Sequence, residues 1–327
     1  MLLDLGRSIM IKGFQTIAAF AVAVVLACAM PVLANEAGEQ KAILVTGASS
    51  GIGRNLAEKL AEAGHFVYAG ARKEKDLAEL NAIENIQAVR LDVTSQEQVD
   101  AAVKQVRREG RGLFALVNNA GVASIAPLHK VQDSDLDFIF GVNVAGVVRV
   151  TRAFAPMIIE SKGRIATTGS IAGIATRGNM GVYSMSKHAI EAFSDALAVD
   201  LAASGVSVSV IEPGTYKTNI QRSAMARTIS KMKAAGQDVD AQSKKFAEER
   251  LAAEKTMQEP DAVSEAFMHA LFSNSPNRRY VVVPNEDQAR YTISAQINEL
   301  VQLNEWHDYR FSREQLIEML DQAQSRK

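Results

Sequence analysis

The stretch Ala42-Ile-Leu-Val-Thr-Gly-Ala-Ser-Ser-Gly-Ile-Gly53 joins a short apolar run, typical of a buried strand, to a glycine-rich turn. Glycines at positions 47, 51 and 53 let the backbone approach a pyrophosphate, whose charge is attracted by the amides and positive dipole end of the following helix. The spacing G-x-x-x-G-x-G differs from the usual dinucleotide fingerprint G-x-G-x-x-G. A plain tight strand-to-helix turn has the same glycines, so the interpretation depends on the rest of the chain.

From Ala42 onward, short β-branched runs alternate with amphipathic stretches. The expected strands are Ala42–Thr46, Phe66–Gly70, Ala88–Leu91, Leu113–Asn118, Arg164–Thr168, Ser207–Ile211 and Tyr280–Val283. The expected helices include Ile52–Ala63, Gln96–Arg107, Val144–Glu160, Tyr183–Ala203 and Asp261–Phe272. This alternation, with nearly continuous apolar strands, predicts a single-domain α/β fold with a doubly wound parallel sheet. Ligands of such sheets bind at the carboxyl ends of the strands.

Two regions depart from this alternation. Residues 218–260 are polar and rich in Ala and Lys, and they predict a helical insertion placed to cover a bound substrate, or else a plain surface excursion. Residues 287–327 predict a helical tail after a catalytic domain at 41–286. At the bend of this tail, Trp306, Tyr309 and Phe311 are expected to pack on the domain or on a partner subunit.

Residues 1–40 form a signal-like or membrane-anchor segment. The stretch 13–34 carries no charge and is long enough to span a bilayer, which takes about 20 residues. Basic residues precede it and Val32-Leu-Ala34 resembles a cleavage site, as in a secretory signal. A start at Met30 would remove the segment. The catalytic domain is expected in the cytoplasm, where NADPH is abundant, with a membrane-anchored or exported protein as the alternative.

Composition excludes several classes of function. Apolar residues make up 47% of the chain and charged residues 22%, which suits a globular domain with a full core. The net charge of −1 gives no electrostatic reason to expect nucleic acid as a partner. The five histidines lack metal-ligand spacing, so no metal site is predicted. Cys28 is the single cysteine, so the chain forms no internal disulfide.

Tyr183 and Lys187 are the strongest candidates for catalysis. A spacing of four places both side chains on one face of a helix, about 5–6 Å apart at Cβ. A permanent ammonium beside the phenol is expected to lower the phenol pKa, so that Tyr183 exchanges a proton near neutral pH. Such pairs are more often surface contacts, but here Ser170 closes the preceding apolar run and the glycine turn lies upstream.

The end of the second expected strand indicates which cofactor binds. NAD proteins carry an acid there that bonds the ribose, whereas a nearby arginine accommodates a 2′-phosphate. Here the run is Tyr68-Ala-Gly-Ala-Arg-Lys73, with no acid until Glu74. Arg72, with Lys73 and Arg54 nearby, therefore favours NADP(H) over NAD(H), although Lys73 and Glu74 also suit a helix start.

Together these residues resemble the short-chain dehydrogenase/reductase family, in its compact Tyr-x-x-x-Lys branch, over about residues 41–283. The resemblance implies a catalytic tetrad of Asn143, Ser170, Tyr183 and Lys187. It implies cofactor contacts from Gly47, Ser49, Ser50, Gly51, Ile52, Gly53, Arg72, Asp92, Asn119, Tyr183, Lys187, Pro213, Gly214 and Thr218. Asn118-Asn-Ala-Gly121 is similar to the motif that stabilises the central sheet.

The resemblance also implies the reaction, which is reversible hydride transfer between a nicotinamide and an alcohol or ketone carbon. Tyr183 would exchange the hydroxyl proton, Ser170 would bond the substrate oxygen, Lys187 would hold the nicotinamide ribose and Asn143 would position a water. A homodimer or homotetramer is expected. The alternative is a non-catalytic NADP(H)-binding sensor or scaffold on the same fold.

The substrate is expected to be a hydrophobic ketone or secondary alcohol, as in the hydroxysteroid and retinol dehydrogenase branch. No arginine is apparent that would clamp a carboxylate or phosphate. The residues expected near the pocket are mostly apolar: Ala123, Ile125, Ile171, Ala172, Ile174, Met180, Val182, Tyr216 and Met225. Apolar residues line most ligand pockets, so they identify no particular substrate.

Overall fold

The computed structural model describes residues 40–234, 236, 248–249 and 252–325. The uncharged stretch 13–34, Cys28 and part of the predicted insertion lie outside these described residues. Within them the chain forms a seven-stranded sheet in the order β3-β2-β1-β4-β5-β6-β7, and every neighbouring pair is parallel. The strand order reverses between β1 and β4, which is where ligands of such sheets bind. The predicted fold class is confirmed.

The seven strands lie where the sequence predicted them, with ends that differ by up to two residues. Their bounds are β1 Ala42–Val45, β2 Phe66–Ala71, β3 Ile86–Arg90, β4 Ala115–Asn118, β5 Arg164–Thr168, β6 Ser207–Pro213 and β7 Arg279–Val282. In β1 all four side chains are buried, Ile43 and Val45 on one face and Ala42 and Leu44 on the other. Burial on both faces explains why the strand is apolar throughout.

The main helices are α2 Gly51–Glu62, α3 Glu74–Asn81, α4 Gln96–Arg108, α5 Asp133–Phe140, α6 Val147–Glu160, α7 Gly181–Leu201, α8 Ile220–Ala234, α10 Asp261–Phe272, α11 Glu286–Leu303 and α12 Arg313–Ser325. All of the predicted helices are present. Our sequence analysis did not predict α3 and α5. Both have only eight residues, and α3 buries only Leu77 and Leu80, so the helical pattern is too short to stand out.

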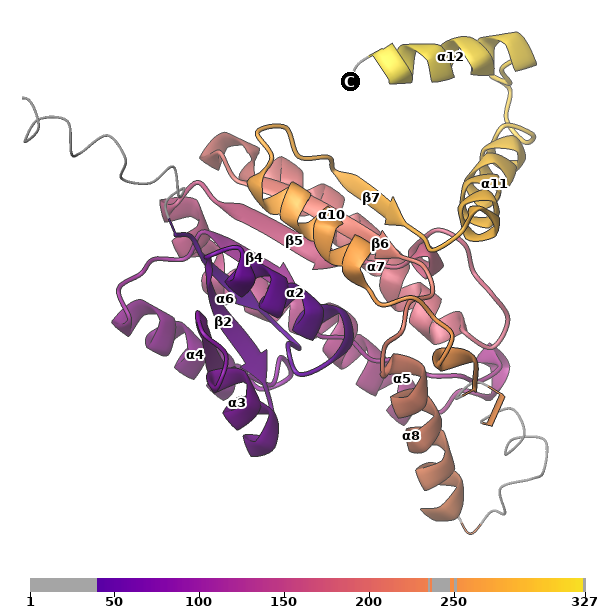
Figure 1. Ribbon diagram of the computed structural model, residues 1–327. Coiled ribbons are helices and arrows are strands. Elements are labelled where there is room, and N and C mark those ends of the chain that lie inside the picture. Colours follow the sequence, from indigo (N-terminus) through magenta and orange to yellow (C-terminus); the bar gives the residue numbers. More distant parts are fainter. Residues whose placement is uncertain (1–39, 235, 237–247, 250–251, 326–327) are drawn as a thin grey trace, which may run out of the picture. The chain divides into compact units, whose positions relative to one another are not determined.

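Helices cover both faces of the sheet. Figure 1 shows α2 and α10 in front of the strands, with α6 and α7 behind them. Leu56 of α2 and Phe267 of α10 belong to the core of the first face, and Val99 of α4 and Phe154 of α6 to that of the second. The helical stretch Asp133–Glu160 is long and apolar enough to cross a membrane, but α6 buries its apolar side against the sheet.

The tail forms two helices, as predicted, and α11 begins at the Asn285 cap, whose side chain accepts a hydrogen bond from the Gln288 amide. At the bend between α11 and α12, Trp306 is 95% exposed and Tyr309 82% exposed, so of the two predicted alternatives these rings do not pack on the domain. They follow the helix end at Leu303, beyond the part of α11 that reaches the rest of the chain. Packing on a partner subunit stays a prediction.

Candidate active site

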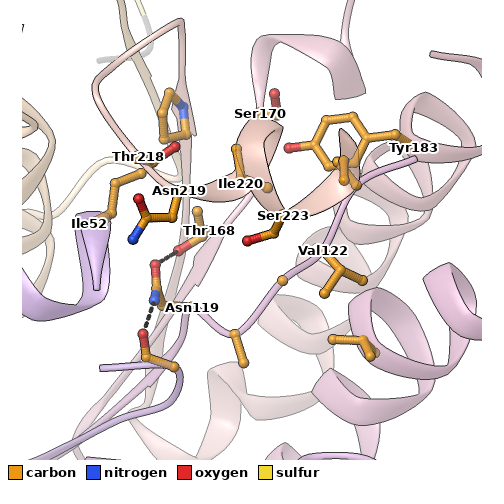
Figure 2. Close-up of a pocket in the computed structure, with 18 of the residues that line it drawn as sticks. Ile52, Asn119, Val122, Thr168, Ser170, Tyr183, Thr218, Asn219, Ile220 and Ser223 are labelled. Atoms are coloured by element: carbon orange, nitrogen blue, oxygen red, sulfur yellow. Dashed lines mark hydrogen bonds between the residues drawn. The ribbon is translucent and has the colours of Figure 1, made fainter. Parts of the chain in front are cut away.

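A cavity of about 610 Å³ opens at the carboxyl ends of the strands. Its walls come from the loops after β1, β2, β3, β4, β5 and β6, together with α8 and one residue of α11. Figure 2 shows Ile52 and Asn119 toward one end of it, and Ser170 and Tyr183 toward the other. These two ends are called the cofactor end and the substrate end below.

The glycine turn forms the wall of the cofactor end. Gly47 and Gly51 have φ angles of +65° and +56°, which side chains rarely tolerate. A Cβ on Gly47 would lie 2.8 Å from the Cα of Ala120, so the backbone here has no room for a side chain. Ser49, Ser50 and Ile52 line the cavity beside the first turn of α2. This cradle of free amides at a helix start fits a dinucleotide pyrophosphate.

Gly53, also predicted to contact the cofactor, lies outside the cavity lining. A Cβ there would overlap the Asn119 side chain and the Gly47 carbonyl. The Asn119 amide nitrogen donates to the Thr46 and Gly47 carbonyl oxygens at 3.0 and 3.2 Å, and Thr168 donates to its oxygen at 3.1 Å. These bonds tie the turn to the neighbouring strand ends, and the close packing of Gly53 is part of that arrangement.

The ends of β2 and β3 bring Arg72 and Asp92 to the same wall. Their side chains lie 3.7 Å apart, and Arg72 is largely exposed. Hydrogen bonds from Thr94 and the charge of Arg72 lower the pKa of Asp92 against the opposing effect of burial. Arg90 donates a hydrogen bond to the Arg72 carbonyl oxygen at 2.8 Å and forms an ion pair with Glu74. Neither contact was predicted from the sequence. The wall thus presents one exposed cation to a ligand.

Ser170, Tyr183 and Lys187 meet near the substrate end. Ser170 ends the loop after β5, and Tyr183 and Lys187 lie in the first two turns of α7. Figure 2 shows the Tyr183 hydroxyl pointing toward Ser170. The Lys187 ammonium is buried, donates to the Thr168 carbonyl at 2.7 Å and lies 5.7 Å from the centre of the Tyr183 ring. The structure therefore brings together three of the four residues of the expected tetrad around one cavity.

The electrostatics of this group differ from the prediction. Burial raises the pKa of the Tyr183 phenol, and the hydrogen-bonding interaction with Ser170 offsets part of that rise. Burial also lowers the pKa of Lys187 to about 8, so its ammonium is less permanent than expected. The prediction that Lys187 lowers the phenol pKa toward neutrality is therefore wrong, because the pKa of Tyr183 is raised. Desolvation is the reason, because both groups lie in the same water-poor wall.

Asn143 lies behind the cavity and not in its lining. It belongs to the π-helical turn η2, Gly141–Gly146, between α5 and α6. Its side chain accepts from the Val122 amide and donates to the Val122 carbonyl, both at 2.9 Å, and donates to the Ser186 hydroxyl at 3.0 Å. Single π-turns of this kind are frequent at functional sites. A plain helix starting at Val144 was expected, and sequence periodicity does not reveal the extra residue.

The segment that follows β6 forms another wall of the cavity. Pro213, Gly214 and Thr218 line the cavity, and Thr218 packs against the Gly51 backbone.

The tail helix α11 reaches this wall, because the Gln288 side chain accepts a hydrogen bond from the Thr215 amide at 2.8 Å. Tyr291 of α11 lines the cavity itself, which no sequence pattern indicated.

The lining of the substrate end is more polar than predicted. Ala123, Ile171, Ala172, Met180 and Tyr216 line the cavity as expected. The other four residues of the predicted set do not, namely Ile125, Ile174, Val182 and Met225. The sequence showed no arginine placed to clamp a carboxylate or phosphate, but Arg177 and Arg227 both line the cavity, Arg177 from the loop after β5 and Arg227 from α8.

A buried carboxyl pair lies under the loop that carries Ser170. Glu212 of β6 is fully buried, and burial, reinforced by repulsion from Glu191, raises its pKa to about 8. Among the described residues no hydrogen-bond donor is placed on either Glu212 oxygen. Protonation of one carboxyl gives the pair a donor, which agrees with the raised pKa of Glu212. Arg279 donates to Glu191 at 3.1 Å and lies 3.7 Å from Glu212. Glu191 also packs beside Gly169 and Gly173, which flank Ser170.

Comparison with known proteins gives consistent similarities. The profile of the family described as short chain dehydrogenase matches residues 41–229. The chain is 34% identical to an NADPH-dependent 3-dehydrocapnine reductase of Ornithobacterium rhinotracheale, covering 74% of this chain and 88% of the relative. It is 34% identical to human retinol dehydrogenase 16, covering 73% and 80%. A solved short-chain dehydrogenase from Streptomyces avermitilis superposes with a TM-score of 0.68 at 26% identity, covering 82% and 96%.

Proposed function

Because the chain belongs to the short-chain dehydrogenase family, we propose that it interconverts a hydrophobic secondary alcohol and its ketone with NADP(H), using Tyr183 as general acid and base. That it is an oxidoreductase acting on an alcohol or carbonyl group follows from the family. One observation carries the finer proposal. The Tyr183 hydroxyl points toward Ser170 and interacts with it beside buried Lys187, in the cavity that the glycine turn also lines.

The roles of the side chains follow from their positions. NADP(H) supplies or accepts the hydride when bound. Ser170 donates a hydrogen bond to the substrate oxygen, where negative charge develops in the transition state. The raised pKa keeps Tyr183 protonated at neutral pH, so its hydroxyl is ready to donate a proton to a ketone oxygen. Lys187, with its pKa near 8, stays largely charged at pH 7 and favours the tyrosinate left behind.

Asn143 acts from behind this group. Its amide holds the Val122 backbone and the Ser186 hydroxyl, one residue before Lys187. We assign it the task of keeping the start of α7 in place and of positioning a water for proton supply to Lys187.

The preference for NADP(H) rests on the end of β2. Arg72 lines the cavity there with its side chain mostly exposed, and among the described residues its acidic partner is Asp92, at 3.7 Å. An exposed ion pair of this kind is weak, so the guanidinium is available to a 2′-phosphate. The NADPH-dependent relative supports the same preference.

The remaining assignments concern the whole chain. Residues 41–286 form the catalytic domain in this proposal, 218–260 cover the substrate and 287–327 complete the pocket from the tail. The cavity lining by Ile220, Ala224 and Tyr291 supports the last two. A cytoplasmic location fits the use of NADPH, and a dimer or tetramer remains the expected assembly.

A substrate screen that follows NADPH absorbance tests the proposal. Wild-type protein is expected to reduce at least one hydrophobic ketone, and Tyr183→Phe to lower kcat/KM about 10²- to 10⁴-fold while the Kd of NADPH stays within about twofold. Tight NADPH binding without turnover of any alcohol or ketone would favour the sensor instead. Equal rates for wild type and Tyr183→Phe would remove Tyr183 from the mechanism.

A further inference from the structure

The charged side chains around the cavity are distributed unevenly. Among the described residues that line it, Asp92 is the only carboxylate, and it lies at the cofactor end beside Arg72. The substrate end carries Arg177 and Arg227 and no lining acid. A ligand in this half of the cavity therefore meets positive charge without a matching negative charge from the wall.

The two arginines differ in how that charge is compensated. Arg227 lies 3.4 Å from the Asp135 carboxylate and over the Phe138 ring at 3.7 Å. Arg177 has no ion pair with a carboxylate in the part of the chain that the structure describes. Its guanidinium lies over the Tyr291 ring, 4.4 Å from the ring centre. Stacking fixes the plane of a guanidinium but leaves the N–H donors at its edge free for another acceptor.

Contacts with the tail helix hold the segment that carries Arg177. The Tyr291 hydroxyl donates to the Thr176 carbonyl at 3.3 Å, next to Arg177 in the chain. Tyr291 belongs to α11, which Gln288 ties to the wall after β6 through the Thr215 amide. The tail helix and the loop after β5 therefore together position one cation in the cavity lining.

We infer that the substrate is an amphipathic keto or hydroxy acid, whose apolar chain lies along the substrate end and whose carboxylate binds Arg177. This inference rests on the proposed function, since it names the substrate class of the same site. The planar fork of a guanidinium matches a carboxylate with two parallel hydrogen bonds. Ile171, Ala172 and Tyr216 give the cavity lining mostly apolar side chains for the apolar chain of the substrate.

A series of methyl ketones that differ only in charge and in chain length tests this inference. The probes are 4-oxopentanoate, 6-oxoheptanoate and 8-oxononanoate, each compared with its methyl ester in NADPH oxidation assays. At the chain length that spans the cavity, the acid is expected to exceed its ester in kcat/KM about 10- to 100-fold, mainly through KM. Arg177→Gln is expected to remove this preference while the ester keeps its rate within about threefold, and Arg177→Lys to restore part of it.

Arg227→Gln is the matched control, because Arg227 has a carboxylate partner in Asp135, which it shares with Lys231. It is expected to leave the preference for the acid intact. Loss of the preference in Arg227→Gln and not in Arg177→Gln would overturn the assignment, as would equal kcat/KM for acid and ester in wild type at every length.

A binding measurement separates this inference from the proposed function. Thermal unfolding of the NADPH-bound protein is recorded with each acid and each ester. A rise in Tm with an acid that disappears in Arg177→Gln supports the anion site, even if no ketone is turned over and the proposed reaction fails. If acids and esters are turned over equally and Arg177→Gln changes neither rate nor Tm, the anion site is refuted. The proposed reaction is then still supported.

Discussion

The two ends of the cavity are built in different ways. The cofactor end is built around one turn, Gly47 to Ile52, where the backbone leaves no space for a side chain on Gly47. The substrate end is assembled from the loop around Arg177, from α8 and from Tyr291 of α11, which are far apart in sequence. Backbone contacts define the first end and side-chain contacts the second. The first should therefore tolerate little change, and the second considerably more.

Adding one methyl group at each end gives the largest expected contrast. Gly53→Ala places a Cβ onto Asn119 and the Gly47 carbonyl, whereas Gly178→Ala meets nothing within 4 Å. Gly53→Ala is expected to raise the Kd of NADPH about 100-fold and to destabilise the fold by about 1–3 kcal/mol, because the turn must shift. Gly178→Ala is expected to change the Kd of NADPH by no more than about twofold and the stability of the fold by no more than about 0.5 kcal/mol. Fluorescence titration and thermal unfolding measure both quantities, and similar losses in the two variants would refute the contrast.

The Glu212–Glu191 carboxyl pair beneath the Ser170 loop makes the stability of the fold depend on pH. Because the pKa of Glu212 is raised to about 8, its contribution to stability is fully present below its ordinary pKa near 4.5 and is lost as pH rises toward 8. Glu212→Gln cannot lose that proton, so relative to wild type it is expected to gain about 2–4 kcal/mol between pH 5 and pH 8.5. Thermal unfolding of both proteins across this range measures the gain.

Glu191→Gln serves as the companion variant. It removes the repulsion but not the burial of Glu212, so the pH dependence is expected to shrink and not to vanish. Parallel stability curves for wild type and Glu212→Gln would show that Glu212 does not bind its proton in the fold.

Arg72 tests the side-chain part of the cofactor end. Arg72→Ala is expected to raise the KM for NADPH about tenfold or more and to leave the KM for NADH nearly unchanged, because only the 2′-phosphate contact is lost. Lys73→Ala, next in the chain and outside the cavity lining, is the control and should change neither. Steady-state kinetics with both coenzymes decides, and an equal loss with NADPH and NADH would contradict the assignment.

The smallest effect is expected at the tail. Tyr291→Phe removes a 3.3 Å hydrogen bond to the Thr176 carbonyl but keeps the ring under Arg177. Since one exposed hydrogen bond contributes roughly 0.5 kcal/mol, kcat/KM for the substrate should fall about twofold and the Kd of NADPH should stay constant. A larger change in the Kd of NADPH than in substrate kcat/KM would mean that α11 acts on the cofactor end.

The cofactor end was the part most accessible to prediction. Local sequence predicts it because a strand, a glycine turn and a helix start follow one another without interruption from Ala42 to Gly53. The four-residue spacing of Tyr183 and Lys187 likewise predicts a shared helix face, which α7 provides. These features depend on neighbours along the chain, so periodicity and turn chemistry are sufficient.

The sequence by itself determined the seven parallel strands, most of the helices between them, the glycine cradle and the grouping of Ser170, Tyr183 and Lys187. Only the tertiary structure decided that Arg177 and Tyr291 line the same cavity, that Asn143 lies behind it in a π-turn and that burial raises the pKa of Tyr183. Such features arise where segments distant in the chain pack together and exclude water. The spacing of residues along the sequence does not predict such contacts or the desolvation that they cause.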